Sequence, residues 1–122
     1  MKRVFYYLLL LPFITKNAYS INSEAIYVMC ETDAENVGKF LQSRYDGYSL
    51  KQVLDHEKKR VRNAVEKGGF DEDVFNLFFS SNAKLIVEAF DQPFPKSKPD
   101  QKLTIEKSVE KHLHKCLKKN MQ

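Results

Sequence analysis

Residues 23–44 read SEAIYVMCETDAENVGKFLQSR, and the rest of the chain is arranged around this segment. Acidic and polar side chains largely separate its apolar ones, which is the pattern of a helix with one buried face. The apolar side chains recur at helical spacing, at Ile26, Met29, Cys30, Ala34, Val37, Phe40 and Leu41. We therefore predict an amphipathic helix with Ser23 as its N-cap and with Cys30 on or beside the buried face.

The second of the two cysteines, Cys116, lies close to the other end of the chain in another amphipathic segment. We interpret Cys30 and Cys116 as a disulfide that joins the first helix to the last. Such a bridge closes a loop of about 85 residues and contributes on the order of 4 kcal/mol in the chain-entropy model.

Residues 1–20 have the layout of a secretory leader. A positive start at Lys2 and Arg3 precedes an apolar run over residues 4–14, and Ala18 and Ser20 place small residues where a signal peptidase cuts. We expect cleavage after Ser20 and one mature domain over residues 21–122. The alternative is a membrane anchor, but a spanning helix needs roughly 20 apolar residues. A periplasmic or secreted location is oxidising, and two cysteines usually pair there.

Removal of the leader changes the charge of the chain. The full sequence carries 20 basic and 16 acidic residues, a net charge of +4. Lys2, Arg3 and Lys16 would leave with the leader, so 17 basic residues and a net charge of +1 would remain. Nucleic-acid binding needs a concentrated basic face. We therefore expect no nucleic-acid partner, and no stable membrane insertion once the leader is gone.

Capping residues divide the following part of the chain into two more helices. The second helix begins at Ser49, which has capping-box spacing with Gln52, and stops at Gly68-Gly69. The third helix begins after Asp71 and is the most aromatic part of the chain, so we expect it at the centre of the core. The polar run Ser80-Ser81-Asn82 is a point at which this helix can kink or divide.

Residues 92–99 contain three prolines and predict an extended crossing segment before a fourth helix over about residues 100–119. No alternation typical of strands persists anywhere in the chain. Cys30 is early in the first helix and Cys116 late in the last, and these two ends meet in an up-and-down arrangement of four helices. The predicted fold is all-α, an antiparallel helical bundle of about four helices closed by one disulfide.

The sequence offers weak candidates for chemistry. His112 and Cys116 share a helix face, but His114 points elsewhere and a metal site needs more ligands than two. No nucleophile motif or Cys-x-x-Cys pair surrounds either cysteine. We therefore expect a protein that is not an enzyme, with no catalytic residue, no metal and no cofactor.

Two features are candidate partner contacts. The first is a basic stripe at Lys107, Lys111 and Lys115, which can meet an acidic partner or anionic lipid headgroups. The alternative is an ordinary solvated helix face, which the interleaved Glu106 and Glu110 favour.

The second feature is Phe94, which lies between Pro93 and Pro95. An aromatic side chain in a segment held extended by prolines can anchor a partner. The alternative is that Phe94 folds back onto the helix ends and joins the core, since large apolar side chains are seldom left exposed.

The leader, the early cysteine, Arg44-x-x-Gly47-x-Ser49, Ala89-Phe90-x-x-Pro93 and the final Cys116 together resemble a group of small uncharacterised secreted proteins of proteobacteria. The resemblance covers most of the mature chain, although residues 60–79 are longer here than in the shorter members. It implies a helical periplasmic protein with a bridge between its ends. It implies no activity and no catalytic residue.

We therefore expect a non-enzymatic exported protein that binds another protein, of unknown identity, in the periplasm. A specific form of this hypothesis is an immunity or inhibitor protein that blocks a toxin or a cell-wall enzyme, by analogy of architecture alone. The alternative is a periplasmic carrier of a small apolar ligand, which would use the phenylalanine-rich interior of the second and third helices.

Overall fold

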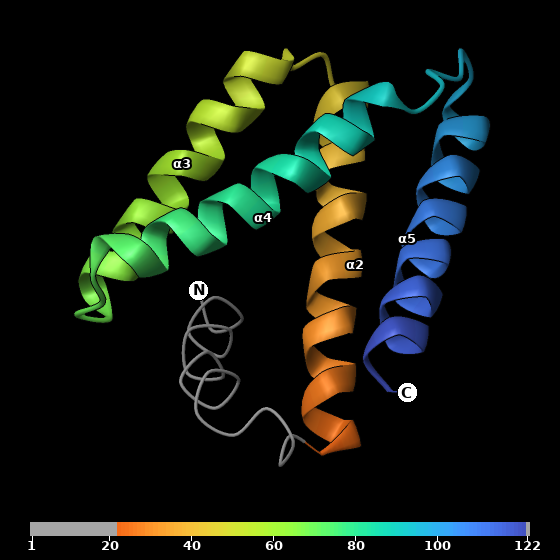
Figure 1. The fold of residues 1–122 in the computed structure, drawn as a ribbon. Helices are drawn as coiled ribbons and strands as arrows, with labels where there is room; N and C mark the ends of the chain where they lie inside the picture. Colours follow the sequence, from red (N-terminus) through yellow and green to blue (C-terminus); the bar gives the residue numbers. More distant parts are fainter. Residues whose placement is uncertain (1–21, 122) are drawn as a thin grey trace.

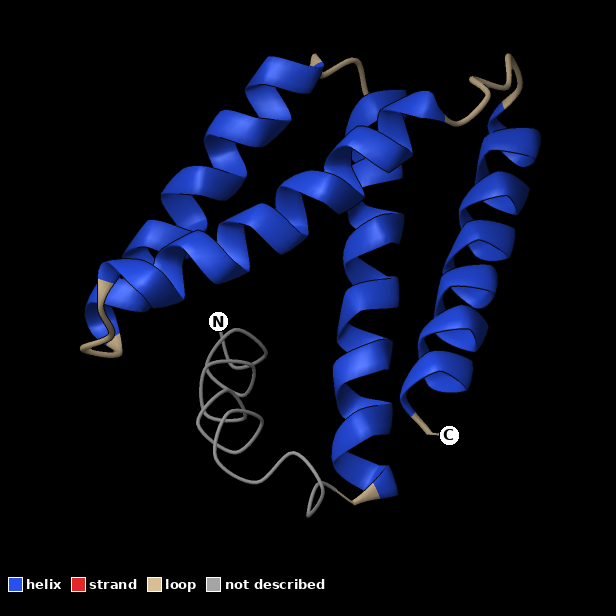
Figure 2. Cartoon of the chain, viewed as in Figure 1, coloured by secondary structure: helices blue, strands red, loops and turns tan. Residues whose placement is uncertain are grey.

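A computed structural model of the chain describes residues 22–121. This part folds into four helices, α2 (Ser23–Tyr45), α3 (Leu50–Lys67), α4 (Glu72–Asp91) and α5 (Lys98–Asn120) (Figure 1). Residues 22–121 contain no strand, so the predicted all-α class is confirmed (Figure 2). None of these helices is both long and apolar enough to cross a membrane. The predicted leader, residues 1–20, lies outside the described residues.

Local side-chain chemistry sets the starts of α3 and α4 as predicted. Ser49 Oγ accepts a hydrogen bond from the Gln52 N–H at 3.1 Å, and the Ser49 N–H donates to Gln52 Oε1 at 2.8 Å. Asp71 Oδ1 accepts from the Val74 N–H at 3.1 Å. Each contact satisfies a backbone donor that has no partner inside the helix.

The predicted starts of the first and last helices need small corrections. The N-cap of α2 is Asn22 rather than Ser23, because Asn22 Oδ1 accepts from the Ala25 N–H at 2.8 Å. The N-cap of α5 is Ser97, so the extended segment ends two residues earlier than predicted and Pro99 lies in the first turn of the helix. Proline fits there because a first-turn N–H has no partner to lose.

The third predicted helix does not divide. α4 continues through Ser80, Ser81 and Asn82 without interruption. Asn82 is buried, and the buried Phe78 and Leu85 flank it along the helix. Packing on both sides of this polar run therefore outweighs its weak helix propensity.

The four helices alternate in direction, and α2 lies at the centre of the arrangement (Figure 1). It contacts each of the other three helices, whereas α5 contacts α2 alone among the described helices. The tight connection between α3 and α4 includes Gly69, whose positive φ of 70° suits glycine. The α3–α4 pair leans away from α2 along most of its length, while α5 runs beside α2 (Figure 1).

The buried side chains form two apolar clusters rather than one. The larger cluster joins α2, α3 and α4 and consists of Phe40, Leu41, Val53, Leu85, Ile86 and Ala89. The smaller one joins only α3 and α4 and consists of Val61, Val65, Phe75 and Phe78. The aromatic helix α4 contributes to both clusters, in keeping with its predicted place at the centre of the core.

The α5 helix is peripheral, with no fully buried residue. Leu103 of this helix is 47% exposed. Ile105 packs against the larger cluster. Close packing on α2 depends on Gly38, because a Cβ atom added there would lie 3.0 Å from Val109 Cγ2 and 3.5 Å from Ile105 Cγ2.

Candidate functional site

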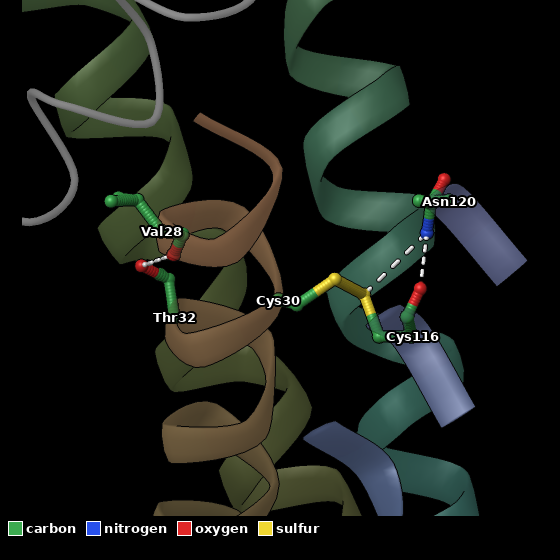
Figure 3. The surroundings of a disulfide bond; sticks show 5 residues. All are labelled: Val28, Cys30, Thr32, Cys116 and Asn120. Carbon is green, nitrogen blue, oxygen red and sulfur yellow. Dashed lines mark hydrogen bonds between the residues drawn. A yellow bond between two sulfur atoms is a disulfide. The ribbon is translucent and has the colours of Figure 1, made fainter. Parts of the chain in front are cut away.

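The predicted disulfide is present and joins the early part of α2 to the late part of α5 (Figure 3). The Cα atoms of Cys30 and Cys116 lie 5.6 Å apart, and Cys30 is completely buried. Asn120 Nδ2 donates to the Cys116 carbonyl oxygen at 2.8 Å and lies 3.6 Å from Cys116 Sγ. With both sulfur atoms in the bridge, this pair has a structural role and offers no thiolate for chemistry.

The histidines beside the bridge do not assemble a metal site. His112 is half-buried and His114 is exposed on α5. Within residues 22–121, no three His, Cys, Asp or Glu side chains come together in a way that would hold a metal ion.

Phe94 lies outside both apolar clusters and is 51% exposed. Its ring meets Tyr45 edge-on at a centroid distance of 5.2 Å, and the Arg44 guanidinium lies 5.3 Å from its ring centroid. Tyr45 Oη donates to the Pro93 carbonyl at 3.3 Å. Burial raises the pKa of the Tyr45 phenol, an effect that the neighbouring Arg44 charge opposes. Phe94 therefore folds back onto the end of α2 but does not become buried in the core, and its role as a partner contact stays a prediction.

The basic stripe is exposed along α5. Lys107, Lys111 and Lys115 all face solvent, as do the interleaved Glu106 and Glu110. Lys115 lies about 25 Å along the helix axis from the first residue of α5. Phe94, just before α5, and the far end of the stripe therefore do not form one compact site.

A larger feature, which the sequence analysis missed, is an open groove between α2 and α3 with α4 at its floor. Its volume is about 690 Å³. Its apolar walls come from all three helices and include Phe40, Val53, Val61, Val65 and Phe78. Polar side chains line the rest, among them Lys39, Gln52, His56, Glu57, Arg60 and Asn82.

Two buried polar side chains distinguish this groove. Glu57 of α3 is 3% exposed and Asn82 of α4 is 5% exposed, and no other polar or charged residue in the described part of the chain is as deeply buried. The Glu57 carboxylate accepts from Arg60, through Nε and, at 3.1 Å, through Nη2. No described residue hydrogen-bonds to the side-chain amide of Asn82.

Comparisons with protein-family profiles, curated proteins and solved structures gave no match for this chain. The resemblance to small secreted proteobacterial proteins therefore stays a prediction.

A signal for the groove does exist in the sequence. Glu57 lies four residues from Val53 and four from Val61, so it occupies a core position of α3. Asn82 occupies a core position of α4 in the same way, between Phe78 and Ile86. A polar residue inside an apolar stripe, on each of two neighbouring helices, is thus the sequence signal for this groove. Only the packing of the helices shows that Glu57 and Asn82 line the same opening.

Proposed function

We propose that this chain is an exported, non-enzymatic module that binds another protein. The observation that carries the proposal is the groove of about 690 Å³, which is open to solvent and combines apolar walls with buried polar groups. Such a combination gives binding energy from the apolar surface and specificity from a few placed polar atoms.

The chemistry of the groove supports binding rather than catalysis. Its buried carboxylate, Glu57, is held by the Arg60 guanidinium, so it is not a free general base. His56 lines the groove but is exposed. Among the described residues, no Asp or Glu side chain hydrogen-bonds to His56. Within the described residues, Glu57 and His56 therefore do not form an acid–base pair in the groove.

Export is supported by the Cys30–Cys116 disulfide, because such bonds persist in oxidising compartments. The proposed leader ends at Ser20, and the intact mass of the exported protein measures where the chain begins. We expect a chain that starts at Ile21. A chain that still starts at Met1 would contradict export by this leader.

An immunity or inhibitor role is the specific form of the proposal that we favour. A small scaffold with a disulfide between its first and last helices resists unfolding outside the cell, where chaperones that consume ATP are absent. This form rests on analogy of architecture alone. A toxin or cell-wall enzyme recovered as the bound protein would support it.

A carrier of a small apolar ligand is the second candidate. The groove volume favours it, since ligand sites commonly enclose about 300–1,000 Å³. The charged Lys39, Glu57 and Arg60 in the lining disfavour it. Native mass spectrometry of the exported protein separates the two candidates, because a retained ligand adds a small mass and a protein partner adds a large one.

The experiment that tests protein binding is the capture of proteins from a periplasmic extract on four matched forms of the chain. The exported protein is immobilised as wild type, as Ala64→Trp to fill the groove, as Phe94→Ala, and as the pair Lys107→Glu and Lys111→Glu. We expect one protein to be retained reproducibly by wild type and lost with at least one variant that still folds. If all four baits retain the same proteins as a blank matrix, the proposed function is wrong.

A further inference from the structure

We infer that the groove between α2 and α3 binds an extended peptide segment of the partner, and that the Asn82 side chain hydrogen-bonds to the backbone of that segment. This inference deepens the proposed function and rests on it. It assigns a ligand class to the groove and a recognition role to one residue.

The Asn82 side chain lies in the groove with its hydrogen-bonding groups available to a ligand. Asn82 is 5% exposed, and its side chain has no hydrogen-bond partner among the described residues. In that part of the chain, every side-chain nitrogen or oxygen atom that is fully shielded from solvent has a hydrogen-bond partner. Because the Asn82 amide has no partner there, its atoms are not fully shielded. They open into the groove that the residue lines.

An Asn side chain complements the polar groups of a peptide backbone. A carboxamide offers both N–H donors and a carbonyl acceptor. A peptide group offers one of each in a similar geometry, so an Asn side chain can pair with both polar atoms of one backbone unit. Because the Asn82 amide opens into the groove, water can reach it in the free protein. A bound backbone would replace that water and pair with the amide in a site shielded from bulk solvent, where hydrogen bonds are stronger.

The groove is long enough for an extended segment. Its lining follows α3 from Gln52 to Val65, a length of about 20 Å at the helical rise. An extended chain rises about 3.3 Å per residue, so about six residues span this length. The backbone N–H and C=O groups inside a helix are already paired with each other, whereas those of an extended segment are free to pair with the Asn82 amide. An extended segment therefore suits the groove better than a helix.

The charges in the groove lining are balanced. The Glu57 carboxylate is paired with Arg60, and the lining also holds one acidic and one basic residue of α2, Glu35 and Lys39. The apolar part of the lining includes Val53, Val61 and Phe78. A segment of about six residues without net charge, with apolar side chains at alternate positions, matches this lining, because alternate side chains of an extended chain point to the same side.

The test starts from a phage-displayed library of random linear heptapeptides, selected against the immobilised exported protein. A selected peptide is then synthesised with a fluorescein label, and its Kd is measured by fluorescence polarisation. We expect enrichment of apolar residues at alternate positions. Loss of one backbone hydrogen-bonded unit should weaken binding about tenfold in Asn82→Leu. Ala64→Trp should abolish binding. Leu103→Ala, at an exposed site on α5 outside the groove lining, should leave the Kd unchanged.

A double-mutant cycle assigns the loss to the backbone contact. Peptides N-methylated at one amide at a time are compared on wild type and Asn82→Leu. At one position we expect methylation to weaken binding to wild type about tenfold and to have little further effect on the variant. Equal losses on both proteins at every position would overturn the role of Asn82.

Amide chemical-shift mapping of wild type keeps the test decisive if a variant fails to fold. Shifts that cluster on α2 and α3 beside the groove support the inference. Shifts elsewhere, preferential binding of helix-stapled peptides, or binding of the apolar dye 8-anilinonaphthalene-1-sulfonate without peptide binding would overturn it. If capture still retains a protein with the Ala64→Trp bait, this inference fails while the proposed function stands.

Discussion

Arg44 connects three segments at the end of α2. Its guanidinium donates to the Ala89 carbonyl at 3.2 Å and to the Gln92 carbonyl, both at the C-terminal end of α4. It also lies near the rings of Phe90 and Phe94, at 5.6 and 5.3 Å from their centroids. The last carbonyls of α4 are thereby satisfied by a cation, which also suits the negative end of the helix dipole.

Phe94→Ala should cost little stability. The ring is 51% exposed and gains mainly an edge contact with Tyr45, so we expect a loss of about 1 kcal/mol in the free energy of unfolding. Leu41→Ala serves as the comparison, because Leu41 is 0% exposed and its truncation should cost about 3 kcal/mol. Urea unfolding of the two variants measures both. A loss for Phe94→Ala equal to that for Leu41→Ala would contradict the exposed placement of the ring.

The α2–α5 contact depends on a residue without a side chain. Gly38→Leu should displace α5, since even a Cβ atom at this position would lie 3.0 Å from Val109 Cγ2. The disulfide would still tether the far end of α5, so the chain should stay folded with a loosened helix. Relative to wild type, we expect amide hydrogen exchange to rise more in α5 than in α4. Gly38→Ala is the matched control: its gain in helix propensity offsets part of the crowding, and its exchange should stay near that of wild type.

The α3–α4 pair is joined by an ion pair between Arg62 and Glu72. The two guanidinium nitrogens of Arg62 donate to the Glu72 carboxylate at 2.5 and 3.2 Å, and the guanidinium lies 3.5 Å from the Phe75 ring centroid. The hydrogen bond from Arg62 and, to a smaller extent, its positive charge lower the pKa of Glu72 from its ordinary value of 4.5.

Glu72→Gln should make the free energy of unfolding depend less on pH between pH 7 and about pH 3. The pKa of Glu72 is lower in the folded protein than in the unfolded chain. The stabilisation that the Arg62–Glu72 pair gives is therefore fully present at pH values above the pKa of the unfolded chain. It is lost as pH falls through the pKa of the folded protein. The difference in unfolding free energy between wild type and Glu72→Gln should be largest at pH 7 and shrink toward pH 3. Salt should reduce it too, since the pair is exposed. Urea unfolding across this range measures the difference, and a constant difference would contradict the pKa direction.

At the level of the whole molecule, the disulfide reinforces a helix, α5, that docks on a single neighbour. This helix has no fully buried residue and contacts α2 alone among the described helices. The bridge spans a sequence separation of 86 residues, and constraining a loop of that length is worth about 4 kcal/mol in the chain-entropy model.

The double variant Cys30→Ala with Cys116→Ala should therefore lower the free energy of unfolding by up to about 4 kcal/mol. Local opening should increase most in the last turns of α5, beside the lost bridge, so amide hydrogen exchange should rise most there. Amides of α3 and α4 that exchange only through global unfolding should rise by no more than the lost stability allows. Urea unfolding and α5 exchange rates that both match the wild type would contradict a stabilising role for the bridge.

Much of this architecture follows from short-range chemistry in the sequence. The caps at Ser49 and Asp71 are contacts between residues three positions apart, so local residue types suffice to predict them. The disulfide followed from two cysteines and an alternating helix order. The all-α class followed from apolar periodicity, which persists through each helix.

Packing between distant segments determines the rest. Whether α4 divides at Ser80 depended on side chains buried around Asn82, and the peripheral place of α5 depended on which helices it meets. The groove needs three helices at once, because Glu57 and Asn82 line one opening although 25 positions separate them in the chain. A residue's burial and hydrogen-bond partners are properties of its spatial neighbours. The unpartnered amide that marks the candidate site therefore becomes visible only after the helices have packed.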